Sequence, residues 1–419
     1  MSTLDALRQA VLASPDDDLP RLVFADYLEE NGDPDRAAFI RAQIELAKTP
    51  EYEPFAVLCK TGKREWVTGT VWEDGLSYLP RRGSVRWAAR PFQRGFGWAL
   101  ESTFLPDTDQ ATYRLFTLEP IGELHLGTAI LDQWREFAAS PWLPRIRSIA
   151  LTGLTSPNEP LRCLRESPYT TGVTSLRLEH TNVASLSYIL GDLFAAPLGK
   201  RLTSLSMRLG YGHADEWLEA IAAGGDVLLK EYDLYRMGFG PAAARVFADS
   251  GLAARTENLR LVGNPLMDGG VKILATAANT LRVLDLTETM LDESATEGLT
   301  QSPRFGSLRK LVLNGNPLSS WAMKGIARSP HLAGLRSLGL ANTQCDNAGV
   351  RYLTRGVIWP NLVELDLRNN PINDPGAKHL VTAPPAPDLT SLMVPTRNIT
   401  DAMRAELKAK FGEVVSWAD

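Results

Sequence analysis

The clearest signal along the chain is a repeated spacing of apolar residues in its C-terminal half. Five segments begin with LxxLxL or a close variant, and each starts 27 residues after the one before it. They are LRVLDLTETML at Leu281, LRKLVLNGNPL at Leu308, LRSLGLANTQC at Leu335, LVELDLRNNPI at Leu362 and LTSLMVPTRNI at Leu389. In such a pattern the apolar residues of a short strand point into one core, and the residues between them face the other way. A register held over five copies predicts an array of repeated units.

Weaker copies of the pattern extend the array toward the N-terminus. Their starts fall 25 to 29 residues apart, at Ile121, Ile146, Val173, Leu202, Leu229 and Thr256. The sequence therefore predicts about eleven units between residues 119 and 400. After each strand, segments such as GNPLMDGGVKILA combine an apolar residue, a polar bend and an amphipathic run. This second half of the unit predicts a helix.

The combination of strand and helix resembles the leucine-rich repeat family, in particular its ribonuclease-inhibitor-like type. The resemblance implies an α/β fold: a curved solenoid with a parallel β concave face and helices outside. Four asparagines follow strands, where a side-chain amide can satisfy backbone groups of the turn: Asn264, Asn316, Asn342 and Asn370. Because each unit buries its apolar face only against its neighbours, both ends need caps. Residues 401–419 are expected to form a C-terminal capping helix.

Residues 1–48 predict three short helices ahead of the array, a small mainly helical module. The second helix is expected to end at Asn31-Gly32, and the third to begin at Asp33-Pro34. We expect Asp26 to bind Arg36 or Arg41 across this turn. We expect this pair to be partly buried, so that breaking it should cost about 3 kcal/mol.

The same segment, RLVFADYLEENGDPDRAAFIRAQ at residues 21–43, resembles the repeat-companion domain, a short bacterial module that often precedes leucine-rich repeats. The matching residues are Phe24, Ala25, Asp26, Tyr27, Leu28, Glu29, Gly32, Arg36, Phe39, Ile40, Arg41 and Gln43. FQRGFGWALE at residues 92–101 is similar to the FxRGF segment that follows in such proteins. The resemblance supplies no activity, but it implies a bacterial, intracellular interaction protein.

Residues 49–118 are expected to connect the helical module to the array. From Cys59 to Arg94 the connector holds eight basic and three acidic residues, interleaved with aromatic ones. VTGTVWEDGLSYL is a candidate β-hairpin within it. Arginines among aromatic residues can contact phosphates and stack on bases, or they can dock onto acidic protein surfaces. The candidate contacts for nucleic acid or an acidic partner are Arg81, Arg82, Arg86, Arg90 and Arg94.

Composition and charge narrow the class of protein. Of 419 residues, 44% are hydrophobic and 22% are charged, with a net charge of -5. These values predict a soluble folded protein without a global affinity for nucleic acid or membranes. The cysteines, Cys59, Cys163 and Cys345, do not form a disulfide framework, and neither a signal peptide nor a membrane span is recognisable. The expected location is therefore the cytoplasm.

The sequence shows no motif or residue spacing that predicts a catalytic site. The five histidines have no metal-site spacing, and HExxH, GxSxG and phosphate-binding motifs do not occur. We therefore expect no catalytic, cofactor-binding or metal-binding residues and no cofactor.

The outward strand positions, at the third, fifth and seventh residue of each unit, form the candidate binding surface. They include Arg177, Glu179, Arg208, Glu231, Asp233, Tyr235, Asn258, Arg260, Asp285, Lys310, Glu364, Asp366 and Arg368. A long concave surface of mixed charge recognises folded proteins through dispersed contacts. The sequence thus predicts a non-enzymatic scaffold that recruits, inhibits or presents a protein partner, with signalling or defence suggested by fold analogy alone. Two alternatives stay open: a nucleic-acid-associated protein using residues 59–94, and a regulatory subunit or proteolytic substrate of a partner enzyme.

Overall fold

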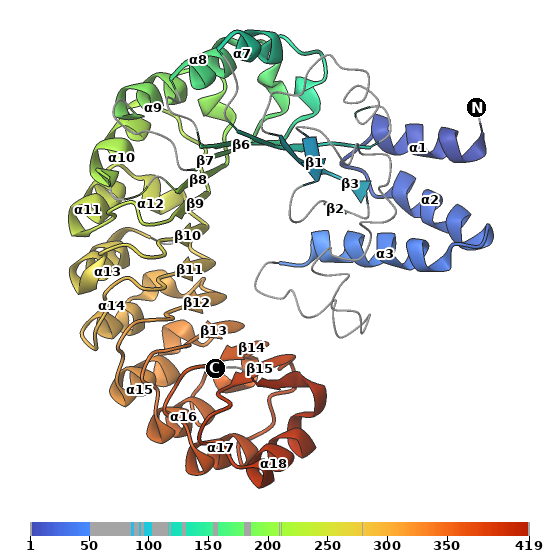
Figure 1. Cartoon of the computed structure of the whole chain (residues 1–419). Coiled ribbons are helices and arrows are strands. Elements are labelled where there is room, and N and C mark those ends of the chain that lie inside the picture. The colour runs from blue at the N-terminus through green and yellow to red at the C-terminus, as the bar shows by residue number, and fades with distance from the viewer. Residues whose placement is uncertain are drawn as a thin grey trace. The chain divides into compact units, whose positions relative to one another are not determined.

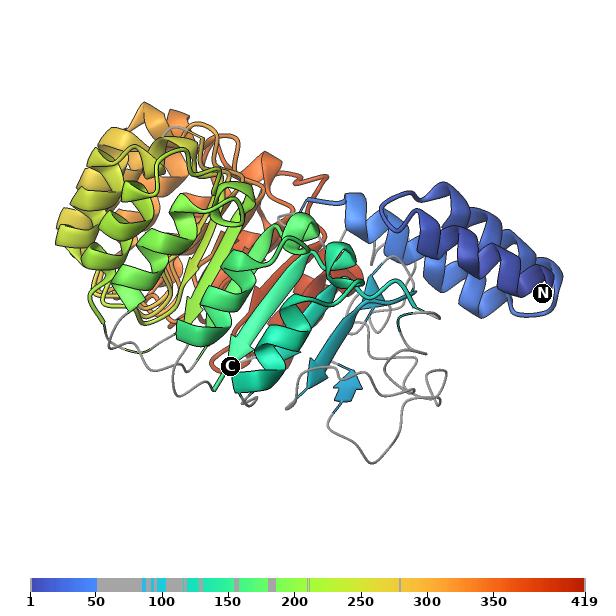
Figure 2. The ribbon, with the colours of Figure 1, turned by 90° about the horizontal axis from the view of Figure 1, so that it is seen from above.

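The chain forms two compact units, Met1–Leu202 and Thr203–Asp419. The structure is a computed structural model, shown in two orientations in Figures 1 and 2. It describes residues 2–50, 85–87, 92–93, 96–102, 116, 119–127, 131–153, 158–179, 186–208, 210, 212–278 and 280–417.

The N-terminal part of the first unit consists of helices α1 (Thr3–Ala13), α2 (Leu19–Glu30) and α3 (Pro34–Lys48). Ser2 and Asp5 cap α1 reciprocally, and the hydrogen bonds from Ser2 hold the pKa of the Asp5 carboxyl below its usual range. The chain turns after α2 at Gly32, where φ is +93°, and the Asp33 side chain then accepts the N–H of Arg36. The helix ends predicted around residues 31 to 34 are confirmed.

The core of this helical part includes a residue from farther along the chain. Phe24, Ala25, Ala37 and Ile40 are buried together with Phe96 of strand β3 (Phe96–Gly97). The rings of Phe24 and Phe96 meet edge to face, with centroids 5.2 Å apart. Phe96 of the FQRGFGWALE segment therefore packs against the helices, and its burial contributes to their stability.

The ion pair predicted between α2 and α3 forms, but on the surface. Arg41 Nη2 lies 2.7 Å from Asp26 Oδ1 and 2.6 Å from Glu29 Oε2, and the Asp26 side chain is 63% exposed. Arg36 lies instead over the ring of Phe39, 5.2 Å from its centroid. The expected partial burial was wrong, because Asp26 lies on the solvent side of α2. An exposed pair contributes less than about 1 kcal/mol.

A parallel sheet begins in the first unit. Its strands lie in the order β1 (Val85–Trp87), β4 (Ala99–Ser102), β5 (Glu123–Leu126), β6 (Ser148–Thr152) and β7 (Ser175–Glu179). β1 is antiparallel to β4, the other pairs are parallel, and β2 (Phe92–Gln93) pairs with β3 in a short antiparallel ribbon. Helices α7 (Leu131–Ala138), α8 (Asn158–Glu166) and α9 (Leu186–Ala195) follow β5, β6 and β7. The candidate hairpin VTGTVWEDGLSYL lies outside the described residues.

The second unit consists of consecutive strand–helix turns. Its parallel strands are β8 (Ser204–Arg208), β9 (Glu231–Leu234), β10 (Asn258–Arg260), β11 (Val283–Asp285), β12 (Lys310–Val312), β13 (Ser337–Gly339), β14 (Glu364–Asp366), β15 (Ser391–Val394) and β16 (Val415–Trp417). Its helices are α10 (Ala214–Ala223), α11 (Pro241–Asp249), α12 (Leu252–Arg255), α13 (Met267–Ala277), α14 (Ala295–Gln301), α15 (Ser320–Arg328), α16 (Asn347–Thr354), α17 (Asp374–Val381) and α18 (Asp401–Phe411). Within this unit the strands line the inner side of an arc and the helices lie outside (Figure 1).

The strands fall where the repeat register predicts them. Each predicted unit start, from Ile121 to Leu389, is followed by one strand that begins two residues later, β5 to β15. In neighbouring units equivalent leucines are partners, as in Leu259 with Leu284 and Leu311 with Leu338, and all four are fully buried. The predicted α/β repeat solenoid is confirmed.

The C-terminal end differs from the single capping helix that was predicted. α18 ends at Phe411, and Gly412 follows with a φ of +61°. Val415–Trp417 then forms β16, which runs parallel to β15. The reason is local: a left-handed glycine ends the helix, and the β-branched residues after it favour a strand that covers the last edge of the sheet.

Buried asparagines join consecutive turns of the second unit. Asn316 Oδ1 accepts the N–H groups of Thr289 and Leu291, each at 3.0 Å. Asn316 Nδ2 donates to the carbonyls of Leu286 and Leu313, at 2.7 and 2.9 Å. One fully buried amide thus satisfies four backbone groups, three of them in the preceding turn. Asn264 and Asn370 make the equivalent four bonds in their own turns.

In the two repeats between these asparagines, Thr289 and Thr343 occupy the equivalent position. Their hydroxyls donate to the carbonyls of Leu286 and Leu340, just after the strand of the same repeat. Asn342, which was predicted to belong to the asparagine set, does not. It lies one position earlier, is exposed and has a φ of +53°. The same position is left-handed at Gly263 and Gly315, so Asn342 fits the turn conformation rather than the buried amide site.

We expect Asn316→Ala to lower the free energy of unfolding by at least about 3 kcal/mol, because it leaves several buried backbone groups without partners. Urea denaturation measures the loss. The control is Asn361→Ala, which removes one exposed bond to the Ala333 carbonyl and should cost less than about 1 kcal/mol. Equal losses in the two variants would contradict the structural role of Asn316.

Asp26→Ala should lower the free energy of unfolding by less than about 1 kcal/mol, because the pair with Arg41 is exposed and Glu29 still holds the guanidinium. Thermal denaturation in low and high salt checks this. A loss near 3 kcal/mol that persists in high salt would contradict the exposed pair and support the partly buried one that was first expected.

Tyr232 is fully buried on β9, with its ring centroid 5.1 Å from that of Phe247. Its hydroxyl has no hydrogen-bond partner among the described residues, and burial raises the pKa of the phenol. Tyr232→Phe is therefore expected to raise the free energy of unfolding by about 1 kcal/mol in urea titrations. Tyr235→Phe, on the other face of the sheet, serves as the control with no change. A less stable Tyr232→Phe protein would refute the assignment of an unsatisfied hydroxyl.

Candidate functional site

Alternation along the strands separates core residues from outward ones. In β10, Leu259 is fully buried while Asn258 and Arg260 on either side are half-buried. The structure places the predicted set on the strand face that points away from the helices. Arg177 and Glu179 lie on β7 of the first unit. In the second unit lie Arg208 on β8, Glu231 and Asp233 on β9, Tyr235 after β9, Asn258 and Arg260 on β10, Asp285 on β11, Lys310 on β12, Glu364 and Asp366 on β14, and Arg368 after β14.

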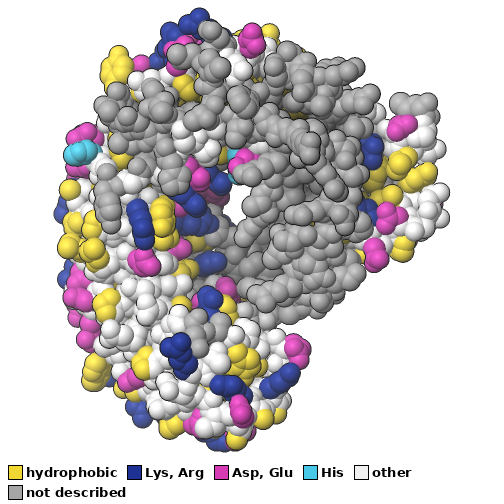
Figure 3. All heavy atoms as spheres, viewed as in Figure 1, with side chains coloured by type: hydrophobic (Ala, Val, Ile, Leu, Met, Phe, Trp, Pro, Cys, Tyr) yellow, Lys and Arg dark blue, Asp and Glu magenta, His cyan; other side chains and the backbone are white. Residues whose placement is uncertain are grey.

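A compact group of charges surrounds Tyr235. The guanidinium carbons of Arg208 and Arg236 lie 5.7 and 5.2 Å from the centroid of its ring. Arg208 Nη2 also lies 3.2 Å from Asp233 Oδ2, and Ser206 donates to the same oxygen. The ring is thereby held beside two cations, an arrangement that stabilises its position by cation–π attraction. Basic and acidic side chains are likewise intermingled on the face shown in Figure 3.

Arg236 was not predicted, and alternate glycines make room for it. It has a left-handed φ of +51°, and its Nη2 lies 3.6 Å from Glu288 Oε2. A Cβ on the intervening Gly263 would lie 2.6 Å from Arg236 Cγ, and one on Gly315 would lie 2.8 Å from Glu288 Cγ. The absence of a side chain in every second turn therefore lets the long side chains reach along the edge of the strands.

The central strands hold a carboxylate close to basic residues. Asp285 accepts the N–H and the hydroxyl of Thr287, at 3.0 and 2.6 Å. Burial raises the pKa of the Asp285 carboxyl, although the bonds from Thr287 and the charges of Arg260 and Lys310 act in the opposite direction. Asp285 is thus tied to its own turn and is less available to a partner than Arg260 and Lys310.

Toward the C-terminal strands the outward residues become smaller. Ser337 and Gly339 of β13 are buried, and a Cβ on Gly339 would lie 2.8 Å from Val312. Arg368 donates to both oxygens of Asp366, at 2.9 and 2.7 Å, and Asp366 is only 5% exposed. Asp366 therefore positions Arg368 and offers little surface of its own. Further bonds between neighbouring strands join Asn258 to Glu231 and Ser337 to Glu364.

In the first unit, β5 adds a pair that was left out of the predicted set. His125 Nε2 lies 2.6 Å from Glu123 Oε1, and on β7 Arg177 Nε lies 3.9 Å from Glu179 Oε1. Burial disfavours ionised Glu123, but the hydrogen bond to His125 and the charges of His125 and Arg177 prevail and hold the pKa of Glu123 below its usual range. The signal was present in the sequence, because Glu123 is the third residue of its unit.

Most of the basic residues of the connector lie outside the part of the chain that the structure describes. Arg81, Arg82, Arg90 and Arg94 lie outside the described residues. Arg86 lies in β1, in register with Glu101 of β4. Contact of these arginines with nucleic acid or an acidic partner stays a prediction.

Reactive groups are few in the described part of the chain. No group of three or more His, Cys, Asp or Glu side chains there is arranged to hold a metal ion. The thiols of Cys163 and Cys345 are buried, and burial raises the pKa of both, that of Cys345 to about 12. Thiols in this state are poor nucleophiles. No described helix is both long and apolar enough to cross a membrane.

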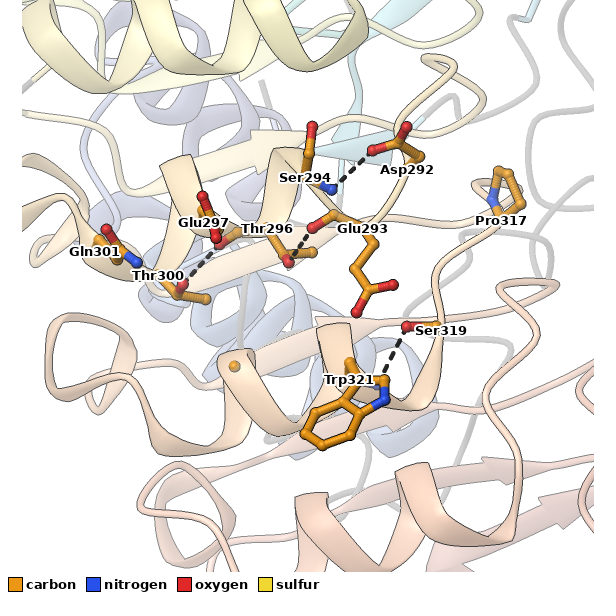
Figure 4. Close-up of a pocket in the computed structure, with 11 residues that line it drawn as sticks. Asp292, Glu293, Ser294, Thr296, Glu297, Thr300, Gln301, Pro317, Ser319 and Trp321 are labelled. Atoms are coloured by element: carbon orange, nitrogen blue, oxygen red, sulfur yellow. Dashed lines mark hydrogen bonds between the residues drawn. The ribbon is translucent and has the colours of Figure 1, made fainter.

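A pocket of about 780 Å³ opens on the helical side of the second unit, between α14 and α15 (Figure 4). The residues around it include Asp292, Glu293, Glu297, Ser319 and Trp321. The sequence did not reveal it, because its carboxylates occupy exposed positions in α14 and just before it, where solvated charges are expected. The pocket forms only where the facing sides of α14 and α15 leave space between them, and the sequence does not show which sides these are.

Three solved structures are similar to this chain at low identity. The first is an internalin (inlF) from Listeria monocytogenes, with 18% identity and a TM-score of 0.40, covering 67% of this chain and 69% of that one. The second is the Rad7 and Elc1 complex from yeast, with 15% identity and a TM-score of 0.43, covering 71% and 80%. The third is a protein from Bacteroides fragilis, with 14% identity and a TM-score of 0.32, covering 68% and 69%.

Neither a scan of protein-family models nor a search of curated proteins gives a match to this chain. The likeness of residues 21–43 to the repeat-companion domain stays a prediction. The fold itself rests on the chain's own repeats, with one strand per unit at the third residue, a helix opposite and asparagine bridges between turns. These features together are those of a leucine-rich-repeat solenoid.

Proposed function

We propose that the chain is a non-enzymatic scaffold that binds a folded protein partner on the strand face of its repeats. The observation that carries this proposal is the group around Tyr235, where Arg208 and Arg236 flank one aromatic ring. Tyrosine and arginine are the residue types that, with tryptophan, dominate the energy of protein interfaces. Arg208 is exposed, and Tyr235 is half-buried, so the group can both hold its geometry and contact a partner.

The distribution of charge supports a macromolecular partner. Glu231 and Asp233 lie on β9, Arg260 on β10 and Lys310 on β12, so charges of opposite sign are spread over successive strands. A surface of this kind makes many contacts at separate points, and its charge pattern selects between partners. A small ligand would instead need several polar groups directed into one enclosed site.

Pairing within the surface supports the same proposal. Asp233 fixes Arg208, and Asp366 fixes Arg368 through two bonds. Long side chains held in one geometry lose less conformational entropy when a partner binds. The partner therefore meets a surface that is already ordered at its arginines.

The biological context of the proposal is a bacterial cytoplasmic protein in signalling or defence that recruits, inhibits or presents its partner. The alternatives are nucleic-acid association through residues 59–94 and a role as regulatory subunit or proteolytic substrate of an enzyme. The strand face is preferred because its charged and aromatic groups are described and arranged, as the contacts of Tyr235 show.

A variant in which Tyr235, Arg260 and Arg368 are all alanine is expected to recover its partner roughly tenfold less efficiently or worse from an extract of the native cell. Quantitative mass spectrometry of the captured proteins measures this. The control variant replaces the same residue types at exposed positions on or beside the helices, Tyr188, Arg245 and Arg304, and should behave as the wild type. Unchanged recovery by the strand-face variant would refute the proposal.

A further inference from the structure

Trp321 is an exposed aromatic residue on the helical side of the second unit. It lies in the first turn of α15, where its backbone N–H donates to the side chain of the capping residue Ser319, and it is 62% exposed. Lys324, one turn later, lies over its ring, with Nζ 4.2 Å from the centroid. The inward face of α15 is filled by other apolar residues, such as Met323 and Ile326, so the core does not need Trp321. Tryptophan is the residue type most strongly associated with interface energy.

The surface on the α14 side of Trp321 is acidic. Asp292, Glu293 and Glu297 are exposed and line the pocket that Trp321 also lines (Figure 4). The N–H of Ser294 donates to Asp292 at 2.7 Å and holds the pKa of that carboxyl below its usual range. This side of the tryptophan therefore carries negative charge at neutral pH.

A glycine keeps the acidic side open. Gly325 of α15 lines the pocket, and a Cβ there would lie 3.6 Å from Thr300 Cγ2 of α14. The equivalent position of the next repeat holds Tyr352. Space beside Trp321 thus results from a small residue at a position where the neighbouring unit has a large one.

The surface on the α16 side of Trp321 is basic. Lys324 Nζ lies 5.9 Å from the ring centroid of Tyr352, and the guanidinium carbon of Arg351 lies 5.4 Å from it. Burial lowers the pKa of His379 on α17, and the charges of Arg355 and Arg351 lower it further, so both arginines reach toward α17. From residue 319 to residue 361 the sequence holds one acidic residue, Asp346, which caps α16.

The acidic group on the α14 side and the basic group on the α16 side lack the ion-pair partners that other charged residues of the second unit have. Arg336 lies 2.7 Å from Asp388, and Lys378 lies 2.7 Å from Glu406. In contrast, the ion pairs between described residues include none of Glu293, Glu297, Lys324, Arg328, Arg351 and Arg355. An acidic and a basic group, each unneutralised within the described chain, therefore flank one exposed tryptophan.

We propose that this helical surface binds a second copy of the chain, in a two-fold arrangement with Trp321 near the axis. A two-fold interface brings the same patch of both copies together in reversed orientation. Glu293 and Glu297 of one copy then face Arg351 and Arg355 of the other, on both sides of the axis. A patch of one sign would repel its own copy, whereas a patch divided into acidic and basic halves is complementary to itself.

The expected strength follows from the same groups. Exposed charge pairs contribute little each, so the tryptophan provides most of the apolar burial and the charges provide register. We expect dissociation constants on the order of 1–10 μM, rising with salt because the charges are screened. The dimer surface lies on the helical side of the second unit, opposite the strands of that unit, so dimerisation does not depend on the protein partner of the strand face.

Sedimentation velocity of the full chain at micromolar concentrations tests the dimer with two charge reversals. One variant carries Glu293→Lys and Glu297→Lys, so that basic residues predominate in its patch. The other carries Arg351→Glu and Arg355→Glu, so that acidic residues predominate in its patch. Each is expected to be monomeric alone, and an equimolar mixture of the two is expected to form a heterodimer, which misfolded variants would not do.

Two further variants complete the test. Trp321→Ala keeps every charge and should weaken dimerisation roughly tenfold or more. Glu216→Lys with Glu219→Lys reverses two exposed carboxylates on α10 and should leave the dimer unchanged. A monomeric wild type at low salt, a dimer that survives both patch reversals, or a mixture that stays monomeric would each overturn the proposal.

Discussion

The asparagine side chains at the ends of alternate strands are the constraint on which the rest of the second unit depends. A repeated turn buries backbone N–H and C=O groups that neither helix nor strand pairs, and each such group left alone costs about 1–3 kcal/mol. Asn264, Asn316 and Asn370 supply an acceptor and two donors at that place. Because each amide bonds mainly to the preceding turn, it also fixes how far one repeat is rotated and displaced from the next repeat. The leucine core provides most of the favourable free energy, but leucines alone do not set that spacing.

Fixed spacing explains why the two faces of the second unit carry different chemistry. On the strand side, side chains from neighbouring strands lie close enough to pair, as Arg208 does with Asp233. The alternation of Gly263 and Gly315 with Arg236 and Glu288 works only if the turns keep a constant distance. On the helical side, residue size at one position decides whether neighbouring helices close up or leave a pocket, as at Gly325. The core is thus shared, while each face can change residue by residue without disturbing the other.

Much of this fold follows from the sequence, because its period is visible in the leucines. Every strand from β5 to β15 begins at the third residue of a predicted repeat, since LxxLxL fixes both the register and the inward face. Residue type alone was insufficient at Asn342, where one position separates a buried amide from a left-handed turn residue. The pairing of Asp26 with Arg36 or Arg41 was predicted, and Arg41 is the partner in the structure. The exposure of the pair was not predicted, because the packing angle of α2 on α3 decides it.

The candidate sites were less predictable for the same physical reason. Strand-face residues follow from alternation, and even Glu123 would have been found by applying the rule to the first predicted unit. The surface around Trp321 depends on two helices that are neighbours in space and about one repeat apart in the chain. Charges there look like ordinary solvated residues until the helices are placed. Which residues are held rigidly, such as Arg368 against Asp366, also appears only with the coordinates.

Amide hydrogen exchange measured residue by residue tests the central claim most directly. The N–H groups of Thr289 and Leu291, held by Asn316, are expected to exchange only when the surrounding turns unfold cooperatively. Their protection should then equal that of the strand amides bonded between β11 and β12. Exchange of Thr289 and Leu291 as fast as that of exposed loop amides, with the strands still protected, would contradict that claim.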